Sequence, residues 1–162
     1  MKNKKVLFLT QAAMIAAIYV VLAVLFAPAS SDPIQVRLAE ALTILPVFTP
    51  AAIPGLFIGC LLGNVIVGCI LPDIIFGSIA TLLGALGTYL LRKQNKFLAP
   101  IPPIVSNIII VPFILRYAYG MDLPIPLMML TVGIGEIISC GVFGIILYSP
   151  LAKHRHKLFK LI

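Results

Sequence analysis

Six apolar segments, separated by prolines and short polar stretches, occupy almost the whole chain. They cover residues 7–27, 38–48, 51–69, 74–91, 104–119 and 127–147. A helix of about 20 apolar residues crosses the hydrocarbon core of a bilayer, so most of these segments are close to that length. Hydrophobic residues make up 61% of the 162 residues and charged residues 10%, a far more apolar balance than in soluble domains. The sequence predicts an all-α membrane protein with no room for a soluble catalytic or ATP-binding domain.

The first apolar segment, residues 7–27, follows three lysines and precedes small residues, which is also the pattern of a secretory signal peptide. Its 21 residues exceed the apolar core of about 7–15 residues that such peptides carry. We therefore expect an uncleaved first span. Residues 1–162 are expected to form one integral-membrane domain.

The second apolar segment, residues 38–48, is too short for an ordinary span. Its 11 residues would make about 16 Å of α-helix, against the roughly 30 Å thickness of the hydrocarbon core. Two arrangements are open at this point. The chain crosses with a short, irregular piece that its neighbours bury, which gives six spans, or it dips and returns, which gives five.

The positions of the basic residues favour six spans. If both termini are cytoplasmic, ten basic residues lie inside and two lie outside. The inside set is Lys2, Lys4, Lys5, Arg92, Lys93, Lys96, Lys153, Arg155, Lys157 and Lys160, and the outside set is Arg37 and Arg116. Five spans would place four inside and eight outside, against the excess of positive charge that cytoplasmic loops carry. The net charge of +7 is therefore interpreted as a topology signal, and no nucleic acid is expected as a partner.

Small residues recur at helical spacing in two segments. Four alanines, Ala12, Ala13, Ala16 and Ala17, form two interleaved pairs in the first segment. Such pairs allow close helix approach in a membrane, either within the bundle or against a partner protein. Gly55, Gly59 and Gly63 form a second ridge in the third segment, and here packing within the bundle is the better interpretation.

A small set of polar residues interrupts the apolar segments, and Glu136 is the most conspicuous because it lies in the middle of the last one. An ionisable residue inside a membrane normally faces the bundle interior and has a function. The other members are Arg37, Glu40, Asn64, Asp73 and Asn107. Some of these residues also have simpler interpretations. Arg37 and Glu40 are spaced to pair with each other on a helix face. Asp73 is placed to cap a helix, and Asn107 is placed to join two helices. Taken together, the six predict one pocket that opens to the outside.

Signals for catalysis or metal binding are weak. The chain lacks HExxH, GxSxG and phosphate-loop motifs, and no histidine lies inside an apolar segment, so the common hydrolase machineries lack their bases or ligands. Cys60, Cys69 and Cys140 have no ligand-like spacing and are expected to be free core thiols. The sequence favours binding over bond cleavage, with no metal and no cofactor.

Several longer motifs resemble the queuosine-precursor transporter (QueT) family. They are QVRLAEAL at residues 35–42, LPVFTPAAIPGLFIGC at 45–60, Asn64, DIIFGSIATL at 73–82, Pro102-Pro103 with Asn107, and Gly133-x-Gly135-Glu136. The resemblance extends over nearly the whole chain, from the first segment to the last.

This resemblance implies the substrate-binding S-component of an energy-coupling factor (ECF) transporter. Such a protein is a six-helix, multi-pass component of the bacterial plasma membrane that captures a vitamin-like compound outside. A transmembrane T-component and two ABC-type ATPases energise its release inside. The alanines Ala12, Ala13, Ala16 and Ala17 match the small-residue face that S-components present to the T-component. The implied substrate is a 7-deazaguanine, such as queuine or its 7-cyano or 7-aminomethyl precursors.

Three other functions fit parts of the pattern. The runner-up is an S-component for another small vitamin. Two further alternatives are a small intramembrane enzyme that uses Glu136 and Asp73 as acid and base, and an assembly subunit whose polar residues only join helices. A ligand-binding panel would distinguish the vitamin carrier. Turnover of a ligand by the isolated protein would support the enzyme, and failure to bind any small molecule would support the assembly subunit.

Overall fold

The computed structural model describes residues 2–30 and 36–159, and all regular secondary structure within these ranges is helical. Pro33 and Gln35, which contribute to the sequence patterns above, and Lys160 lie outside the described residues. The main elements, in chain order, are α1 (Lys2–Leu25), η1 (Ala27–Ser30), η2 (Leu38–Val47), α2 (Ala52–Val67), η3 (Asp73–Gly77), α3 (Ser78–Leu91), α4 (Ile101–Tyr117), α5 (Ile125–Glu136), η4 (Ile137–Phe143) and α6 (Gly144–Leu158).

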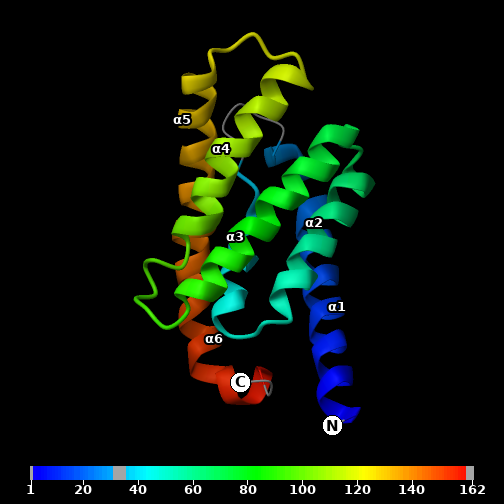
Figure 1. Cartoon of the computed structure of the whole chain (residues 1–162), viewed down its shortest axis with the longest axis vertical. Helices are drawn as coiled ribbons and strands as arrows, with labels where there is room; N and C mark the ends of the chain where they lie inside the picture. Colours follow the sequence, from blue (N-terminus) through cyan, green and yellow to red (C-terminus); the bar gives the residue numbers. More distant parts are fainter. Residues whose placement is uncertain (1, 31–35, 160–162) are drawn as a thin grey trace.

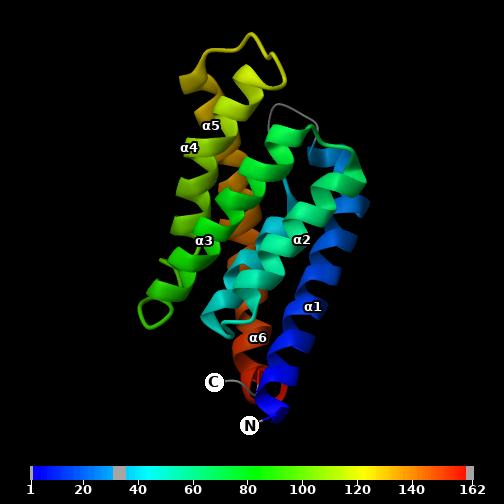
Figure 2. The same ribbon diagram turned by 45° about the vertical axis from the view of Figure 1, so that its right-hand side comes forward.

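The helices form an elongated bundle in which successive passages of the chain run in opposite directions (Figures 1 and 2). Helix α1 begins, and α6 ends, at the same end of the bundle, and the loop between α4 and α5 lies at the opposite end (Figure 1). Elements η3 and α3 are continuous, as are α5, η4 and α6. The chain therefore passes along the bundle six times, counting η2 as one passage.

Element η2 is the short, irregular piece that the sequence predicted for the second segment. It is a 3-10 helix of ten residues with Pro46 inside it, about 20 Å long at the rise of such helices. Every residue from Ala39 to Pro46 is buried. Because a 3-10 helix satisfies its backbone groups less well than an α-helix, burial between neighbouring helices is what such a segment needs in a membrane.

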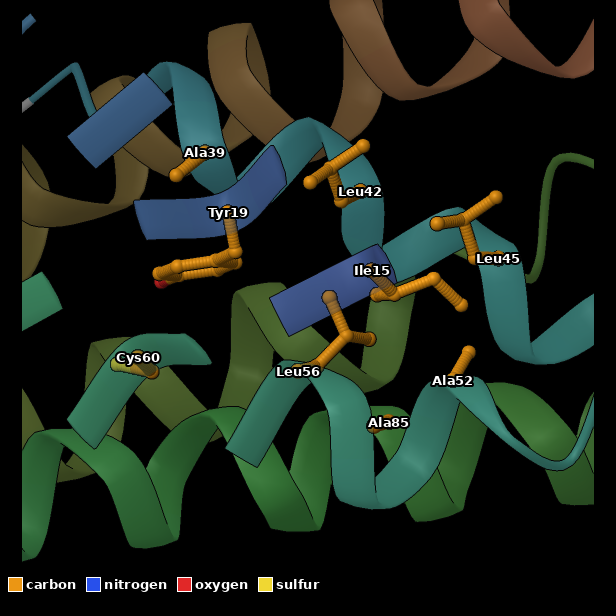
Figure 3. Packing of buried hydrophobic residues seen from close by; sticks show 9 residues of the cluster. All are labelled: Ile15, Tyr19, Ala39, Leu42, Leu45, Ala52, Leu56, Cys60 and Ala85. Atoms are coloured by element: carbon orange, nitrogen blue, oxygen red, sulfur yellow. The ribbon is translucent and has the colours of Figure 1, made fainter. Parts of the chain in front are cut away.

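Helices α1 and α2 pack closely along the glycine ridge, as the sequence predicted. A Cβ atom on Gly55 would lie 2.7 Å from the carbonyl oxygen of Ala12, and one on Gly59 would lie 2.7 Å from the Cβ of Tyr19. Both distances are shorter than real Cβ atoms tolerate, so only glycine permits this approach. Figure 3 shows the apolar core that results, in which Ile15 and Tyr19 of α1 lie between η2 and α2.

Two helix boundaries differ from the sequence-based expectation. Helix α4 begins at Ile101 rather than 104, because Pro102 and Pro103 fit the first helical turn, where a missing N–H is tolerated. The last helix continues past residue 147 to Leu158 and includes the basic residues Lys153 and Arg155. A helix can extend beyond the hydrocarbon when its polar end reaches water.

The outer surface of the bundle is apolar. Exposed large residues occur on every long helix, for example Leu9 on α1, Leu90 on α3 and Leu130 on α5. Three helices of the described residues, Lys4–Leu25, Asp73–Leu91 and Ile125–Arg155, are long and apolar enough to cross a membrane. Three shorter apolar helices, Leu38–Val47, Ala52–Val67 and Ile101–Tyr117, accompany them. Apolar residues on the outside and polar residues inside are typical of a membrane protein.

Candidate functional site

Glu40 is buried at the first turn of η2 and is held by hydrogen bonds from two other helices. Its Oε1 accepts a short hydrogen bond from the Tyr19 hydroxyl of α1 and a 3.0 Å bond from Thr81 Oγ1 of α3. Only 1% of the residue is exposed. Its second carboxylate oxygen, Oε2, is also buried and has no hydrogen-bond partner within the described ranges.

Glu136 ends α5 and lies beside Glu40. Cys140, one turn further along the same continuous helix, donates its thiol to Glu136 Oε2 at 3.1 Å. The side-chain amide of Asn107 on α4 interacts with the carboxyl groups of both Glu40 and Glu136. Ligand atoms of Glu40, Glu136 and Cys140 all lie within 4.8 Å of one another. Four separate elements thus bring two acids, an amide and a thiol to one point in the bundle interior.

A second polar group surrounds Asp73 at the start of the continuous helix η3–α3. Arg37 Nη2 lies 3.6 Å from Asp73 Oδ2, and the Tyr119 hydroxyl donates to the same oxygen at 3.0 Å. Asn64 donates its side-chain N–H to the backbone oxygen of Asp73 at 3.4 Å. These contacts join the residue before η2, the end of α2, the start of η3 and the α4–α5 loop.

The charges in this second group are well matched. Burial lowers the pKa of Arg37, but the Asp73 carboxylate and the other neighbouring groups together raise it by more, so the guanidinium stays positive. Burial and the Asp73 carboxylate together raise the pKa of Tyr119, so its hydroxyl remains a hydrogen-bond donor. Arg37 also interacts electrostatically with Glu40 and Glu136, which links the two polar groups into one site.

All six polar residues that the sequence singled out lie in these two neighbouring groups. Glu40, Asn107 and Glu136 form the inner group, and Arg37, Asn64 and Asp73 form the outer one. The simpler role of Asp73 as a helix cap does not apply, because its carboxylate binds Arg37 and Tyr119. The ion pair of Arg37 with Asp73 was not anticipated, since the sequence spacing favoured a pair with Glu40.

The sequence did not single out four further residues that contact these groups: Tyr19, Thr81, Tyr119 and Cys140. Hydroxyl and thiol side chains occur in many membrane helices as ordinary packing residues, so they carry no strong signal in a single sequence. Cys60, Cys69 and Cys140 are free, as predicted. The proximity of Cys140 to the two acids depends on packing between η2 and η4, which the sequence alone does not reveal.

The four alanines of α1 lie on two sides of the helix. Ala12 and Ala16 are buried and lie against the glycine ridge of α2. Ala13 and Ala17 are exposed on the neighbouring side. The first pair therefore packs within the bundle, and only the second pair is available to a partner protein.

The described residues form an all-helical bundle with an apolar outer surface and buried polar groups, which is typical of a membrane protein. Comparison with protein families agrees: residues 9–153 match the family described as QueT transporter. Because the match covers most of the chain, the protein belongs to the QueT transporter family, as the sequence motifs predicted, and is not an enzyme. No curated protein and no solved structure matches the chain.

Proposed function

We propose that this protein is the substrate-binding S-component of an ECF-type ABC importer and captures a 7-deazaguanine from outside the cell. Release would depend on a T-component and two ABC-type ATPases, since the chain itself has no nucleotide-binding motif. The observation that carries the proposal is the convergence of Glu40, Asn107 and Glu136 in the bundle interior, in a chain of the QueT transporter family.

The chemistry of these groups suits a deazaguanine. The ring has several N–H donors that carboxylates accept, and a carbonyl oxygen to which an amide or guanidinium can donate. Buried carboxylates make stronger hydrogen bonds than neutral acceptors do. Two carboxylate oxygens, Glu40 Oε2 and Asp73 Oδ1, have no hydrogen-bond partner in the described residues and can accept from the ligand. The side chains of Arg37 and Asn107 can donate to it.

The proposed orientation is six passages through a bacterial plasma membrane, with both termini in the cytoplasm. Three basic parts of the chain lie toward one end of the bundle (Figure 1). They are the start of α1 with Lys4 and Lys5, the loop after α3, and the last part of α6 with Lys153. Arg116 is in the last turn of α4, toward the other end. This distribution supports a cytoplasmic location for the first end, because positive residues accumulate in cytoplasmic loops. The Arg37–Asp73 group then lies toward the outside.

The replacement Glu136→Gln tests the proposed site. The amide keeps the shape of the side chain but loses a charge-assisted hydrogen bond, which contributes roughly 1.5–3 kcal/mol. We expect affinity for 7-aminomethyl-7-deazaguanine to fall about tenfold to a hundredfold, measured by calorimetry on the full chain in lipid nanodiscs. The control is Asp122→Asn, in an exposed loop, which should leave affinity unchanged. Unchanged binding by the Glu136→Gln protein would contradict a role for this carboxylate in the site.

A further inference from the structure

The interior of the bundle contains more negative than positive groups. Glu40, Asp73 and Glu136 are all buried, and the ion pair found for them in the described part of the chain is Arg37 with Asp73. Every other described basic residue lies near a helix end or in a loop, for example Lys4, Arg92, Arg116 and Lys153. Among the described residues, no ion pair joins Glu40 or Glu136 to a basic side chain, and Arg37 acts on both acids through its longer-range charge.

The geometry of the inner group suits a cationic guest. Glu40 Oε2 is buried and unpartnered, and the ligand atoms of Glu40, Glu136 and Cys140 lie within 4.8 Å of one another. Two oxygens at such a separation can both accept hydrogen bonds of about 2.8 Å from one ammonium nitrogen. When both acids are ionised, the positive charge would also relieve the repulsion between them, which a neutral donor cannot do.

Resting on the proposed function, we infer that Glu40 and Glu136 form a subsite for an ammonium group of the ligand. The protein then selects deazaguanines that carry a primary amine over neutral ones of the same ring and similar size. Glu40 supplies its free oxygen, Glu136 supplies the second acceptor, and Asn107 holds both carboxyl groups in position. Arg37 and Asp73 remain as the neutralised outer group.

A metal ion fits the inner group less well than an ammonium group. Cys140 donates its proton to Glu136 Oε2 at 3.1 Å, whereas a cysteine ligand must be a thiolate. Glu40 Oε1 is already engaged by Tyr19 and Thr81. An ammonium group needs only acceptor oxygens, so it leaves these bonds intact.

The test compares two compounds with one ring and different charge: 7-aminomethyl-7-deazaguanine, a cation at neutral pH, and 7-cyano-7-deazaguanine, which is neutral. We expect the full chain in nanodiscs to bind the aminomethyl compound at least about tenfold more tightly. The replacement Glu40→Gln should bring the ratio of the two affinities close to one, mainly by lowering the affinity for the aminomethyl compound. Glu136→Gln serves as a second variant if Glu40→Gln does not fold. Asp122→Asn is the matched control, in which we expect the ratio of the two affinities to stay unchanged.

Four results would overturn the inference. Equal or tighter binding of the cyano compound by the unmodified protein refutes the ammonium subsite while leaving the proposed function standing. An unchanged ratio in the folded Glu40→Gln and Glu136→Gln proteins shows that other groups select the charge. If neither compound binds, the proposed function fails as well. Saturable Zn²⁺ binding that Cys140→Ser removes would make the inner group a metal site instead.

Discussion

Asp73 is the residue that joins the most distant parts of the outer group. Its Oδ2 is shared by Arg37 and Tyr119, and Oδ1 is buried without a partner among the residues described. A carboxylate with one oxygen engaged and one available can hold the outer end together and still accept a ligand donor. We therefore propose that this residue has both a structural and a binding role.

The replacement Asp73→Asn tests how much this buried ion pair contributes to stability, in comparison with an exposed ion pair. Removing the charge takes away one ion-pair partner of the largely buried Arg37, so we expect the free energy of unfolding to fall by about 1–3 kcal/mol, less than for a fully buried pair. Asp122→Asn removes the corresponding partner of Arg116, where Asp122 is fully exposed, and should have no measurable effect. Thermal unfolding of both proteins in the same detergent measures the difference. Equal melting temperatures for the two variants would contradict the structural role of Asp73.

At the residue scale, sequence reasoning selected polar side chains that lie close together in the structure, but it did not predict how they pair. Glu136 and Glu40 stand out because ionisable residues are rare inside apolar segments. Their partners are residues of ordinary appearance, and the choice of Asp73 rather than Glu40 as the ion-pair partner of Arg37 depends on how η2 packs against η3. Such contacts join residues far apart in the chain, so local spacing does not determine them.

Helix α1 has two different faces of small residues, and each supports its own prediction. Ala13 and Ala17 are exposed, whereas Ala12 and Ala16 lie against α2. Replacing Ala13 and Ala17 together by Leu should abolish assembly with a T-component, because bulk prevents close helix approach. Ligand binding by the isolated protein should persist. Co-purification with the tagged T-component and calorimetry measure the two properties.

The buried pair supplies the matched comparison. Replacing Ala12 and Ala16 by Leu places large side chains where α2 already approaches the α1 backbone, so this protein should lose stability and ligand binding together. If instead the Ala13 and Ala17 variant assembles normally, the exposed face is not the docking surface.

At the element scale, prolines and polar residues placed most helix boundaries within a few residues, since a proline ends or begins a helix at definite positions. The length of residues 38–48 also predicted an irregular, buried second passage. What the pattern did not provide is the kind of irregularity: the 3-10 geometry of η2, and the wider turns at Asp73–Gly77 and Ile137–Phe143. Asp73 begins the first of these turns, and Glu136 directly precedes the second. Irregular helical turns of this kind are common at functional sites.

For the molecule as a whole, the six-passage orientation is open to direct measurement. Gln94 is in the loop after α3 and Asp122 is in the loop after α4. We expect a membrane-impermeant thiol reagent to modify Gln94→Cys only from the cytoplasmic side and Asp122→Cys only from outside. The unmodified chain, whose cysteines are buried or half-buried, gives the background. Labelling of both sites from one side would rule out the proposed orientation.

We propose that the bundle holds a 7-deazaguanine, and the most direct test is to identify the small molecule that the protein retains. Full-length protein would be purified from cells supplied with queuosine precursors, and the compound extracted from it identified by mass spectrometry. We expect an unmodified 7-deazaguanine in stoichiometric amount from the native protein, and much less from Glu136→Gln. A vitamin of another class, a chemically altered product, or no retained compound at all would contradict this account.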